Sequence, residues 1–303
     1  MENNKTVEEN KIKKVRLKGN HSFNVREGWL RKGMKGIEEN SDLFSRSDAA
    51  QILGVGSKMV PAIRYWLITT GLAKEEVIKN KHTLVITSDF GRIINNSDPY
   101  FEDIFTLYLM HYNIVTNKDM AIVWQLFYNT FEATSFTREE MQDVLIHELD
   151  KLMAPECTFS ESLVRDDCNS LIKMYLNDEG ENNPDDNLGS PFAILGLIKR
   201  SQSNKHCYEK AAPKFGEIDP LLILYIIIKN AQAGHVSINA LLNNENNIGK
   251  VLNLSRPMIN EYLDQLRLKG YININRTAGL DMVYITTDMS AEAVMEKYYS
   301  QES

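Results

Sequence analysis

The sequence has few cysteines and no long hydrophobic run. Three cysteines, Cys157, Cys168 and Cys207, are spread over 303 residues, which predicts reduced thiols and no disulfide framework. The longest apolar run, residues 221–228, has eight residues, whereas a membrane span needs ~20. The polar N-terminus has no apolar core of a secretory signal. These absences predict a cytoplasmic protein with no membrane partner.

Motifs of several enzyme classes are also missing. The sequence contains no GxxxxGK[ST], GxSxG or HExxH pattern, so ATP hydrolysis, serine-hydrolase and zinc-protease functions have no support. Cys157 and Cys168 are eleven residues apart, which matches no zinc-site spacing. We therefore expect all three thiols to be structural.

Charge is unevenly distributed along the chain, although the net charge is −7. Residues 1–92 carry 17 Lys and Arg against 11 Asp and Glu, a net charge of +6. Residues 93–218 carry 10 against 21, a net charge of −11. Any nucleic-acid contact is therefore expected at the N-terminal end.

The N-terminal region has the pattern of a winged helix. Residues 1–13 are predicted to be a disordered tail, residues 14–17 a short strand, and residues 25–39 a helix. A short helix capped by Ser47 is followed by Gly54 and Gly56 and by a second helix capped by Ser57. Strands are expected at 76–79 and 82–87. A helix-turn-helix followed by a hairpin predicts a winged-helix domain over residues 14–95.

Apolar residues recur at helical spacing in the middle of the chain, and the winged-helix pattern returns at its end. Four amphipathic stripes between residues 98 and 176 predict a helical domain over residues 96–218, with a mobile loop at 177–190. In residues 219–303, short helical pieces precede a helix capped by Ser255, and two strands follow Gly270. The predicted fold is mainly α: a winged-helix domain, a central helical domain and a second winged-helix domain.

The winged-helix patterns identify candidate DNA contacts, because the second helix enters the major groove and the hairpin follows the backbone. The N-terminal candidates are Arg46, Ser57, Lys58, Arg64, Lys79 and Lys81, and the C-terminal ones are Arg256, Asn260, Arg267 and Arg276. We expect the N-terminal copy to carry most of the affinity, through Lys58, Arg64 and the basic segment 11–18. Winged helices also serve as protein–protein modules, and this alternative stays open.

Two groups of residues are candidates for catalysis. Glu148 and Asp167 lie on apolar helix stripes, and buried carboxylates of this kind can hold Mg²⁺ in a nuclease. The alternative is that they pair with Arg165 or Lys173 or reach water. His21 lies close to Arg26 and Trp29 and can serve as a general base beside a phosphate. The alternative here is local packing.

Several segments together resemble a known bacterial family. HSFNVREGWLRKG resembles a "HETF..R.GWL.KG" opening, and TSDFGRIINNSDPYFEDIFTLYLMHYNI resembles a "T.LG..I...DPYLED..TLWLLHW.L" block. VWQLFYNTF and VRDDCNSLIKMYL resemble two further blocks. The family is an uncharacterised-domain family encoded beside phosphoadenosine-phosphosulfate-reductase-like genes. It supplies the B component of Ssp-type DNA phosphorothioation systems.

The resemblance implies a protein that binds double-stranded DNA in a phage-defence system. Its partners would be a cysteine desulfurase, an ATPase and a phosphoadenosine-phosphosulfate-reductase-like protein. It would nick one strand to permit sulfur incorporation, with Mg²⁺ as the candidate cofactor. The sequence departs from the family opening at His21, which is displaced by one position and lacks the following Glu. A winged-helix transcriptional regulator and a non-catalytic scaffold are the alternative functions.

Overall fold

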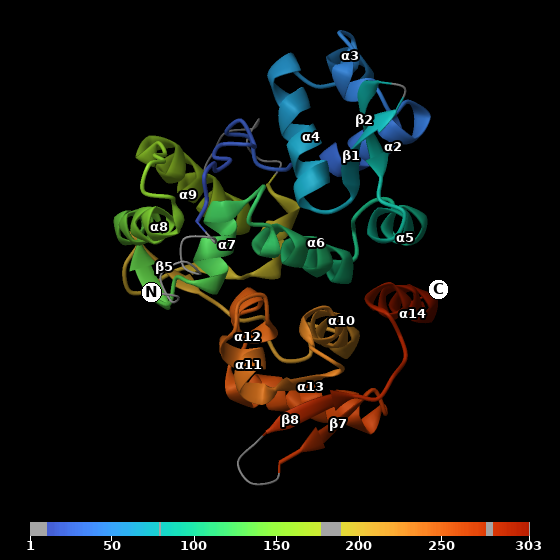
Figure 1. Ribbon diagram of the computed structural model, residues 1–303, viewed down its shortest axis with the longest axis vertical. Coiled ribbons are helices and arrows are strands. Elements are labelled where there is room, and N and C mark those ends of the chain that lie inside the picture. The colour runs from blue at the N-terminus through green and yellow to red at the C-terminus, as the bar shows by residue number, and fades with distance from the viewer. Residues whose placement is uncertain (1–10, 79, 177–188, 277–280, 303) are drawn as a thin grey trace.

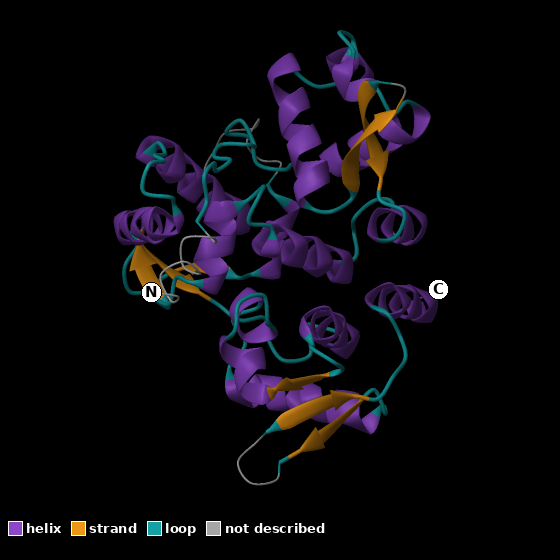
Figure 2. Ribbon diagram, viewed as in Figure 1, coloured by secondary structure: helices purple, strands orange, loops and turns teal. Residues whose placement is uncertain are grey.

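The structure is a computed structural model that describes residues 11–78, 80–176, 189–276 and 281–302 (Figure 1). Helices dominate the described residues, and three small antiparallel sheets accompany them (Figure 2). The N-terminal and C-terminal elements lie at opposite ends of the long axis, and helices α6 to α9 lie between them (Figure 1). The mainly helical class predicted from the sequence is confirmed.

The N-terminal part consists of short helices and a hairpin. Its elements are α2 (Trp29–Glu39), η1 (Leu43–Ser45), α3 (Ala49–Leu53), η2 (Ser57–Met59), α4 (Val60–Thr69), β1 (Ala73–Ile78), β2 (Lys81–Ile86) and α5 (Phe90–Ser97). Strands β1 and β2 pair in antiparallel register from Ala73 opposite Ile86 to Ile78 opposite Lys81. The helices and the hairpin expected in this region are therefore present.

Four local predictions for this part are wrong. Residues 14–17 form no strand, and only Ile12 forms a bridge, to Met153. Helix α2 begins at Trp29 because the preceding Gly28 is left-handed, with φ of 75°. Asp48 rather than Ser47 occupies the cap position of α3. Ser57 begins a 3₁₀ turn instead of capping α4.

Helix α4 forms the core of the N-terminal part. Its start at Val60 places Pro61 in the first turn, where a missing N–H is tolerated. The buried residues of the helix are Ala62, Ile63, Tyr65, Trp66, Leu67 and Thr69. Only a narrow strip of α4, which includes Pro61 and Arg64, reaches the surface.

The four central helices predicted from the apolar stripes are present. They are α6 (Ile104–Thr116), α7 (Ile122–Asn129), α8 (Arg138–Leu152) and α9 (Glu161–Tyr175). Thr137 and Glu140 form a capping box at the start of α8. A three-stranded sheet of order β3-β5-β4 was not predicted, because β3 (Ser135–Thr137), β5 (Cys207–Lys210) and β4 (Ile198–Arg200) are too short for a periodic signal. The 3₁₀ turn η3 (Pro191–Leu195) follows α9 along the described chain.

The C-terminal part repeats the helix and hairpin arrangement. It contains α10 (Pro220–Asn230), β6 (His235–Ser237), α11 (Ile238–Asn243), α12 (Ile248–Val251), α13 (Arg256–Leu268), β7 (Ile272–Asn275), β8 (Met282–Ile285) and α14 (Ala291–Glu302). Ser255 occupies the cap position of α13, with Pro257 in the first turn, as predicted. Strand β6 was missed. It pairs with β8 and extends the hairpin to a sheet of order β6-β8-β7.

Helix α14 packs against both the C-terminal and the N-terminal parts of the fold. It packs against α10 and also against α5 of the N-terminal part. The Tyr298 ring stacks on Phe105 of α6 with ring centroids 3.8 Å apart. The Tyr299 hydroxyl forms a 2.6 Å hydrogen bond with the Thr106 hydroxyl. These contacts connect elements that lie on both sides of the predicted domain boundaries at residues 95 and 218. The division into three domains stays a prediction.

Two predicted segments fall largely outside the described residues. The predicted tail, residues 1–13, is described only from Lys11 onward, and of the loop at 177–190 only Gly189 and Ser190 are described. None of the described helices is both long enough and apolar enough to cross a membrane.

A buried histidine connects three helices at the centre of the molecule. His111 of α6 lies 2.7 Å from the Tyr175 hydroxyl of α9 and 2.7 Å from the Val251 carbonyl of α12. Only Nε2–H can donate to the carbonyl, so Nδ1 accepts from the tyrosine hydroxyl. Burial lowers the pKa of His111 to about 4.

This histidine predicts a loss of stability in mild acid. The pKa of His111 in the folded protein lies below the ordinary value of 6.5. The contribution of neutral His111 to the free energy of unfolding is therefore fully present above pH 6.5 and is lost as the pH falls toward 4. We expect this contribution to fall by about 2 kcal/mol between pH 7 and pH 5. It is measured as the difference between the wild type and His111→Gln, because the raised pKa of the buried Asp167 carboxyl acts in the opposite direction. Urea denaturation of both proteins at both pH values gives this difference. An equal pH dependence in the variant would contradict the assignment.

Candidate nucleic-acid interface

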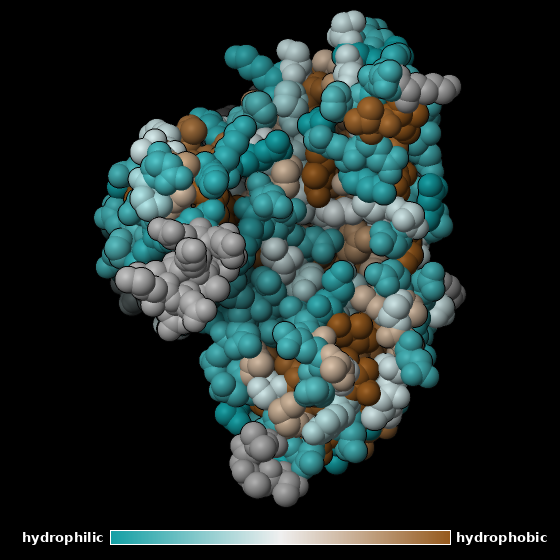
Figure 3. Space-filling view, in the orientation of Figure 1, coloured by the Kyte–Doolittle hydropathy of each residue, from teal (hydrophilic) through white to brown (hydrophobic). Residues whose placement is uncertain are grey.

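A basic cleft of about 340 Å³ lies between the N-terminal loop and helix α4. One wall is formed by the loop residues Arg16, Leu17, Lys18, Gly19 and His21, and the other by Pro61, Arg64 and Tyr65. Three of these side chains are cationic, His21 adds an imidazole, and none of the eight is acidic. In Figure 3 the surface over this loop and the adjoining central helices is mostly hydrophilic. This arrangement suits an anionic ligand such as a phosphodiester.

The cleft brings together residues that were assigned to separate groups from the sequence. His21 was grouped with Arg26 and Trp29, and Arg64 with the recognition helix. His21 instead lines the cleft with Arg64, whereas the Arg26 guanidinium lies over the Trp29 ring, 5.7 Å from its centroid. Arg16 and Lys18 belong to the predicted basic segment 11–18.

The loop that carries His21 has an unusual backbone. Lys18, His21 and Ser22 have positive φ angles of 53°, 52° and 67°, and such residues cost free energy unless their surroundings hold them. The His21 N–H donates to the Lys18 carbonyl at 3.0 Å, which closes a tight turn. A Cβ atom at Gly19 would lie 2.4 Å from the Tyr65 ring, so only glycine permits this approach to α4.

Helix α9 anchors the loop. The Lys18 N–H donates to Asp167 Oδ2 at 2.9 Å, and Lys18 Nζ donates to Asp166 Oδ2 at 2.6 Å. Asp167 is 4 % exposed, and burial raises the pKa of its carboxyl to about 7. The sequence offered no signal for this contact, because 149 residues separate Lys18 from Asp167.

The two carboxylates predicted to hold Mg²⁺ have separate partners. Glu148 pairs with Lys151 of its own helix at 2.7 Å, and the carboxylate beside Asp167 is Asp166 rather than Glu148. The described residues also contain no group of three His, Cys, Asp or Glu side chains arranged for a metal ion. Glu148 and Asp167 therefore do not fit a shared magnesium site.

The remaining N-terminal DNA candidates lie outside the cleft. Arg46 forms a bidentate pair with Asp48 at 2.6 and 2.8 Å, and Lys81 lies 3.9 Å from Asp42. Ser57 and Lys58 are exposed just before α4. Lys79 is outside the described residues. Within the cleft, Arg64 is 2.7 Å from Glu75 of β1.

The C-terminal candidates lie along α13 and the adjacent hairpin. Arg256 pairs with Asp281 at 2.7 Å, and Arg267 pairs with Asp264 at 3.2 Å. Arg276 donates to the Asn260 carbonyl oxygen at 3.4 Å. Acidic partners thus offset both α13 arginines, just as Asp166 and Glu75 offset Lys18 and Arg64 in the cleft.

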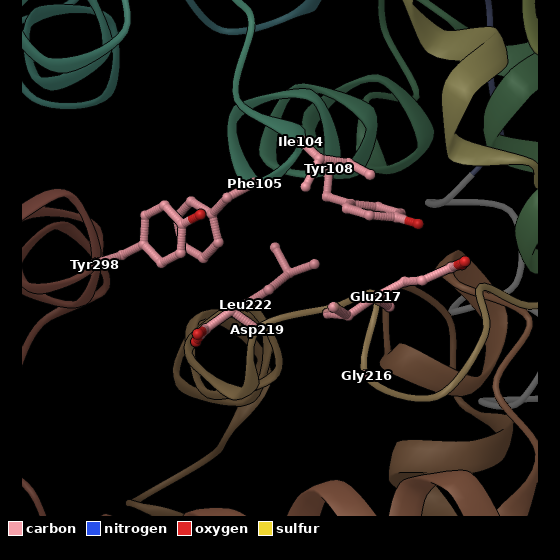
Figure 4. A pocket seen from close by; sticks show the side chains of 9 residues that line it. Ile104, Phe105, Tyr108, Gly216, Glu217, Asp219, Leu222 and Tyr298 are labelled. Carbon is pink, nitrogen blue, oxygen red and sulfur yellow. The ribbon is translucent and has the colours of Figure 1, made fainter. Parts of the chain in front are cut away.

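A second cleft of about 210 Å³ lies between α6, α10 and α14. Figure 4 shows Phe105 and Tyr108 on one wall, Leu222, Glu217 and Asp219 on the opposite wall, and Tyr298 at the side. Both carboxylates have local partners, because Asp219 caps α10 through the Leu221 N–H and Glu217 accepts from the Lys214 N–H. This cleft has no basic lining residue and does not suit an anion.

The three thiols lie away from the basic cleft. Cys168 is buried on α9, and burial raises the pKa of its thiol, which disfavours the reactive thiolate. Cys157 and Cys207 are half-buried. The structural role predicted for them stays a prediction.

The fold and the cleft define a mainly helical protein with a surface cleft lined by basic side chains. Residues 18–299 match the family model described as "Protein of unknown function (DUF4007)", and the chain belongs to this family. This match confirms the family resemblance that the sequence motifs predicted.

Two solved structures share the fold. The chain is similar to a magnesium ion-bound SspB crystal structure, with 22% identity and a TM-score of 0.84 over 97% of this chain and 90% of that chain. It is also similar to a second SspB crystal structure, with 23% identity and a TM-score of 0.82 over 94% of this chain and 88% of that chain. A search of curated proteins gives no match.

Proposed function

We propose that this protein is the DNA-binding component of a bacterial DNA phosphorothioation system and that it nicks one strand to permit sulfur incorporation. The observation that carries the proposal is the cleft in which Arg16, Lys18, His21 and Arg64 converge. Membership in the DUF4007 family and the fold shared with SspB support the same function. The proposed partners are double-stranded DNA, a cysteine desulfurase, an ATPase and a phosphoadenosine-phosphosulfate-reductase-like protein in the cytoplasm.

The two helix and hairpin units are the proposed DNA-binding modules. We assign both to the winged-helix class, with the N-terminal one supplying most of the affinity. Because α4 is largely buried, its contribution is contact with the phosphate backbone through Arg64 rather than insertion into the major groove. Phosphate contacts of this kind position a protein on DNA without reading its sequence.

His21 is the proposed general base of the nicking step. Its side chain is exposed at the cleft, where it can take a proton from a water that attacks the phosphorus atom. The P–O bond to one sugar oxygen breaks, and that oxygen leaves as a hydroxyl after taking a proton from solvent. Arg16 and Arg64 would hold the non-bridging oxygens of the phosphate. A plasmid-relaxation assay tests nicking. It is run with and without added Mg²⁺, because one of the similar SspB crystal structures is magnesium ion-bound.

Replacing both cleft arginines tests DNA binding directly. Each phosphate contact contributes about 0.9 to the slope of log K against log salt on duplex DNA. Arg16→Ala with Arg64→Ala should reduce the slope by about 1.8, which is a ~60-fold loss of affinity at 0.1 M salt. Fluorescence anisotropy with a labelled duplex at several salt concentrations measures both quantities.

Arg138→Ala is the matched control, because Arg138 lies on α8 outside the cleft, where it donates to the Tyr208 hydroxyl at 3.1 Å. It should change the slope by less than half a unit. If the double variant binds like the wild type while Arg256→Ala and Arg267→Ala abolish binding, the C-terminal unit is the DNA contact. Duplex binding without strand breakage under any metal condition would favour the regulator or the scaffold.

A further inference from the structure

We infer that the adjacent carboxylates Asp166 and Asp167 act on the basic cleft in opposite directions. Asp167 is a positioning residue that holds the turn carrying His21, and Asp166 competes with DNA phosphate for the Lys18 ammonium. The inference rests on the proposed DNA-binding function of the cleft. It adds a means by which the central helix α9 controls the N-terminal site.

The case for Asp167 begins with the backbone of Lys18. Lys18 is the first residue of the turn that His21 closes, and its φ of 53° is left-handed. Its N–H points away from the turn and donates to Asp167 Oδ2 at 2.9 Å. Because Asp167 is 4 % exposed on α9, its carboxylate is a fixed point against which the turn is held. Loss of this acceptor frees the turn and moves both Lys18, a proposed phosphate contact, and His21 relative to Arg64.

The same segment has two further fixed points, so the turn is held from both sides. Trp66 Nε1 donates to the Phe23 carbonyl at 2.9 Å, and Asn24 Nδ2 donates to the Ser170 carbonyl of α9 at 3.0 Å. Both follow the turn in the chain. Asp167 fixes the backbone at the beginning of the turn, where the Lys18 side chain also contacts Asp166. The loop therefore stays attached when Asp167 is replaced, and only the turn loosens.

The case for Asp166 rests on its exposure. The Lys18 and Asp166 side chains are 36% and 43% exposed, with 2.6 Å between Nζ and Oδ2. A half-exposed ion pair of this kind is weak in water. Phosphate oxygens entering the cleft offer the same ammonium an equivalent partner, so Asp166 occupies the place of a phosphate in the free protein. Removal of its charge leaves Lys18 available to DNA.

Opposite effects of neighbouring substitutions test the inference. Asp166→Asn should raise affinity for a labelled DNA duplex about fivefold at 0.1 M salt, since one additional phosphate contact corresponds to at most ~8-fold there. Asp167→Ala should weaken binding about tenfold, whereas Asp167→Asn should stay within about twofold because its amide oxygen can accept the Lys18 N–H. Asp150→Asn, an exposed carboxylate change on α8, controls for net charge and should change affinity less than twofold.

Amide NMR spectra of the free protein separate this inference from the function on which it rests. Asp167→Ala should shift the Lys18 and His21 amide resonances, and Asp167→Asn should restore their positions. Unshifted resonances, or an equal sign of the affinity change in Asp166→Asn and Asp167→Ala, would overturn the inference. Wild-type protein that fails to bind DNA, together with the expected NMR shifts, would instead overturn the proposed function and leave Asp167 as the anchor of the turn.

Discussion

Replacing His21 by asparagine is expected to reduce strand nicking by ~10²–10⁴-fold, the usual contribution of a general base. DNA affinity should stay within about twofold, because Arg16, Lys18 and Arg64 remain in the cleft. Asparagine is the appropriate replacement, since His21 is left-handed and asparagine adopts this conformation more readily than most residues. Gel analysis of supercoiled and open-circular plasmid measures the rate.

His206→Asn provides the matched control for this experiment. His206 is also exposed, but it lies in the turn between β4 and β5 and outside the cleft. The control should nick at the wild-type rate. Equal nicking by His21→Asn and the wild type would remove His21 from the reaction and leave the cleft as a binding site.

Trp66→Ala is expected to destabilise the fold by about 4 kcal/mol, in the range measured for large aromatic residues in a core. The Trp66 side chain is fully buried on α4 and lies edge-to-face with Trp124 of α7, with ring centroids 5.8 Å apart. Its indole N–H also donates to the Phe23 carbonyl at 2.9 Å. The substitution therefore removes packing between the N-terminal and central helices and leaves a carbonyl without its donor.

Chemical denaturation followed by circular dichroism measures this change. Trp66→Phe keeps most of the packing and should cost about 1–3 kcal/mol through the lost hydrogen bond and the smaller ring. Phe215→Ala removes a half-exposed ring and should cost less than about 1 kcal/mol. A loss below about 2 kcal/mol in Trp66→Ala would show that the two parts are joined mainly by other contacts.

The sequence predicted the elements whose signal is local. Apolar residues at helical spacing identified α6 to α9, and the glycine turns located the two helix and hairpin units. The short strands β3 to β6 were missed because alternation over three or four positions is not distinctive on its own. Strands β7 and β8 are equally short but were predicted because they follow the end of a helix at Gly270. Helix boundaries were displaced where a left-handed Gly28 or the 3₁₀ turn at Ser57 changed the start.

The candidate site was predicted only in part, because it depends on contacts between distant segments. His21, Arg64 and the basic segment 11–18 were identified by residue type. Their convergence depends on a close approach of Gly19 to Tyr65 and on the carboxylates of α9, neither of which leaves a local pattern. Asp167 was singled out for burial on an apolar stripe, and the structure shows that burial and a hydrogen bond from the Lys18 N–H that the sequence did not predict.

The packing of α14 against α5 has a consequence for biosynthesis. Helix α14 is synthesised after α5, which is complete some two hundred residues earlier in the chain. The N-terminal part therefore emerges from the ribosome with the surface that α14 later covers still open to solvent. That surface is closed only after α14 has been synthesised, and until then it is accessible to molecular chaperones.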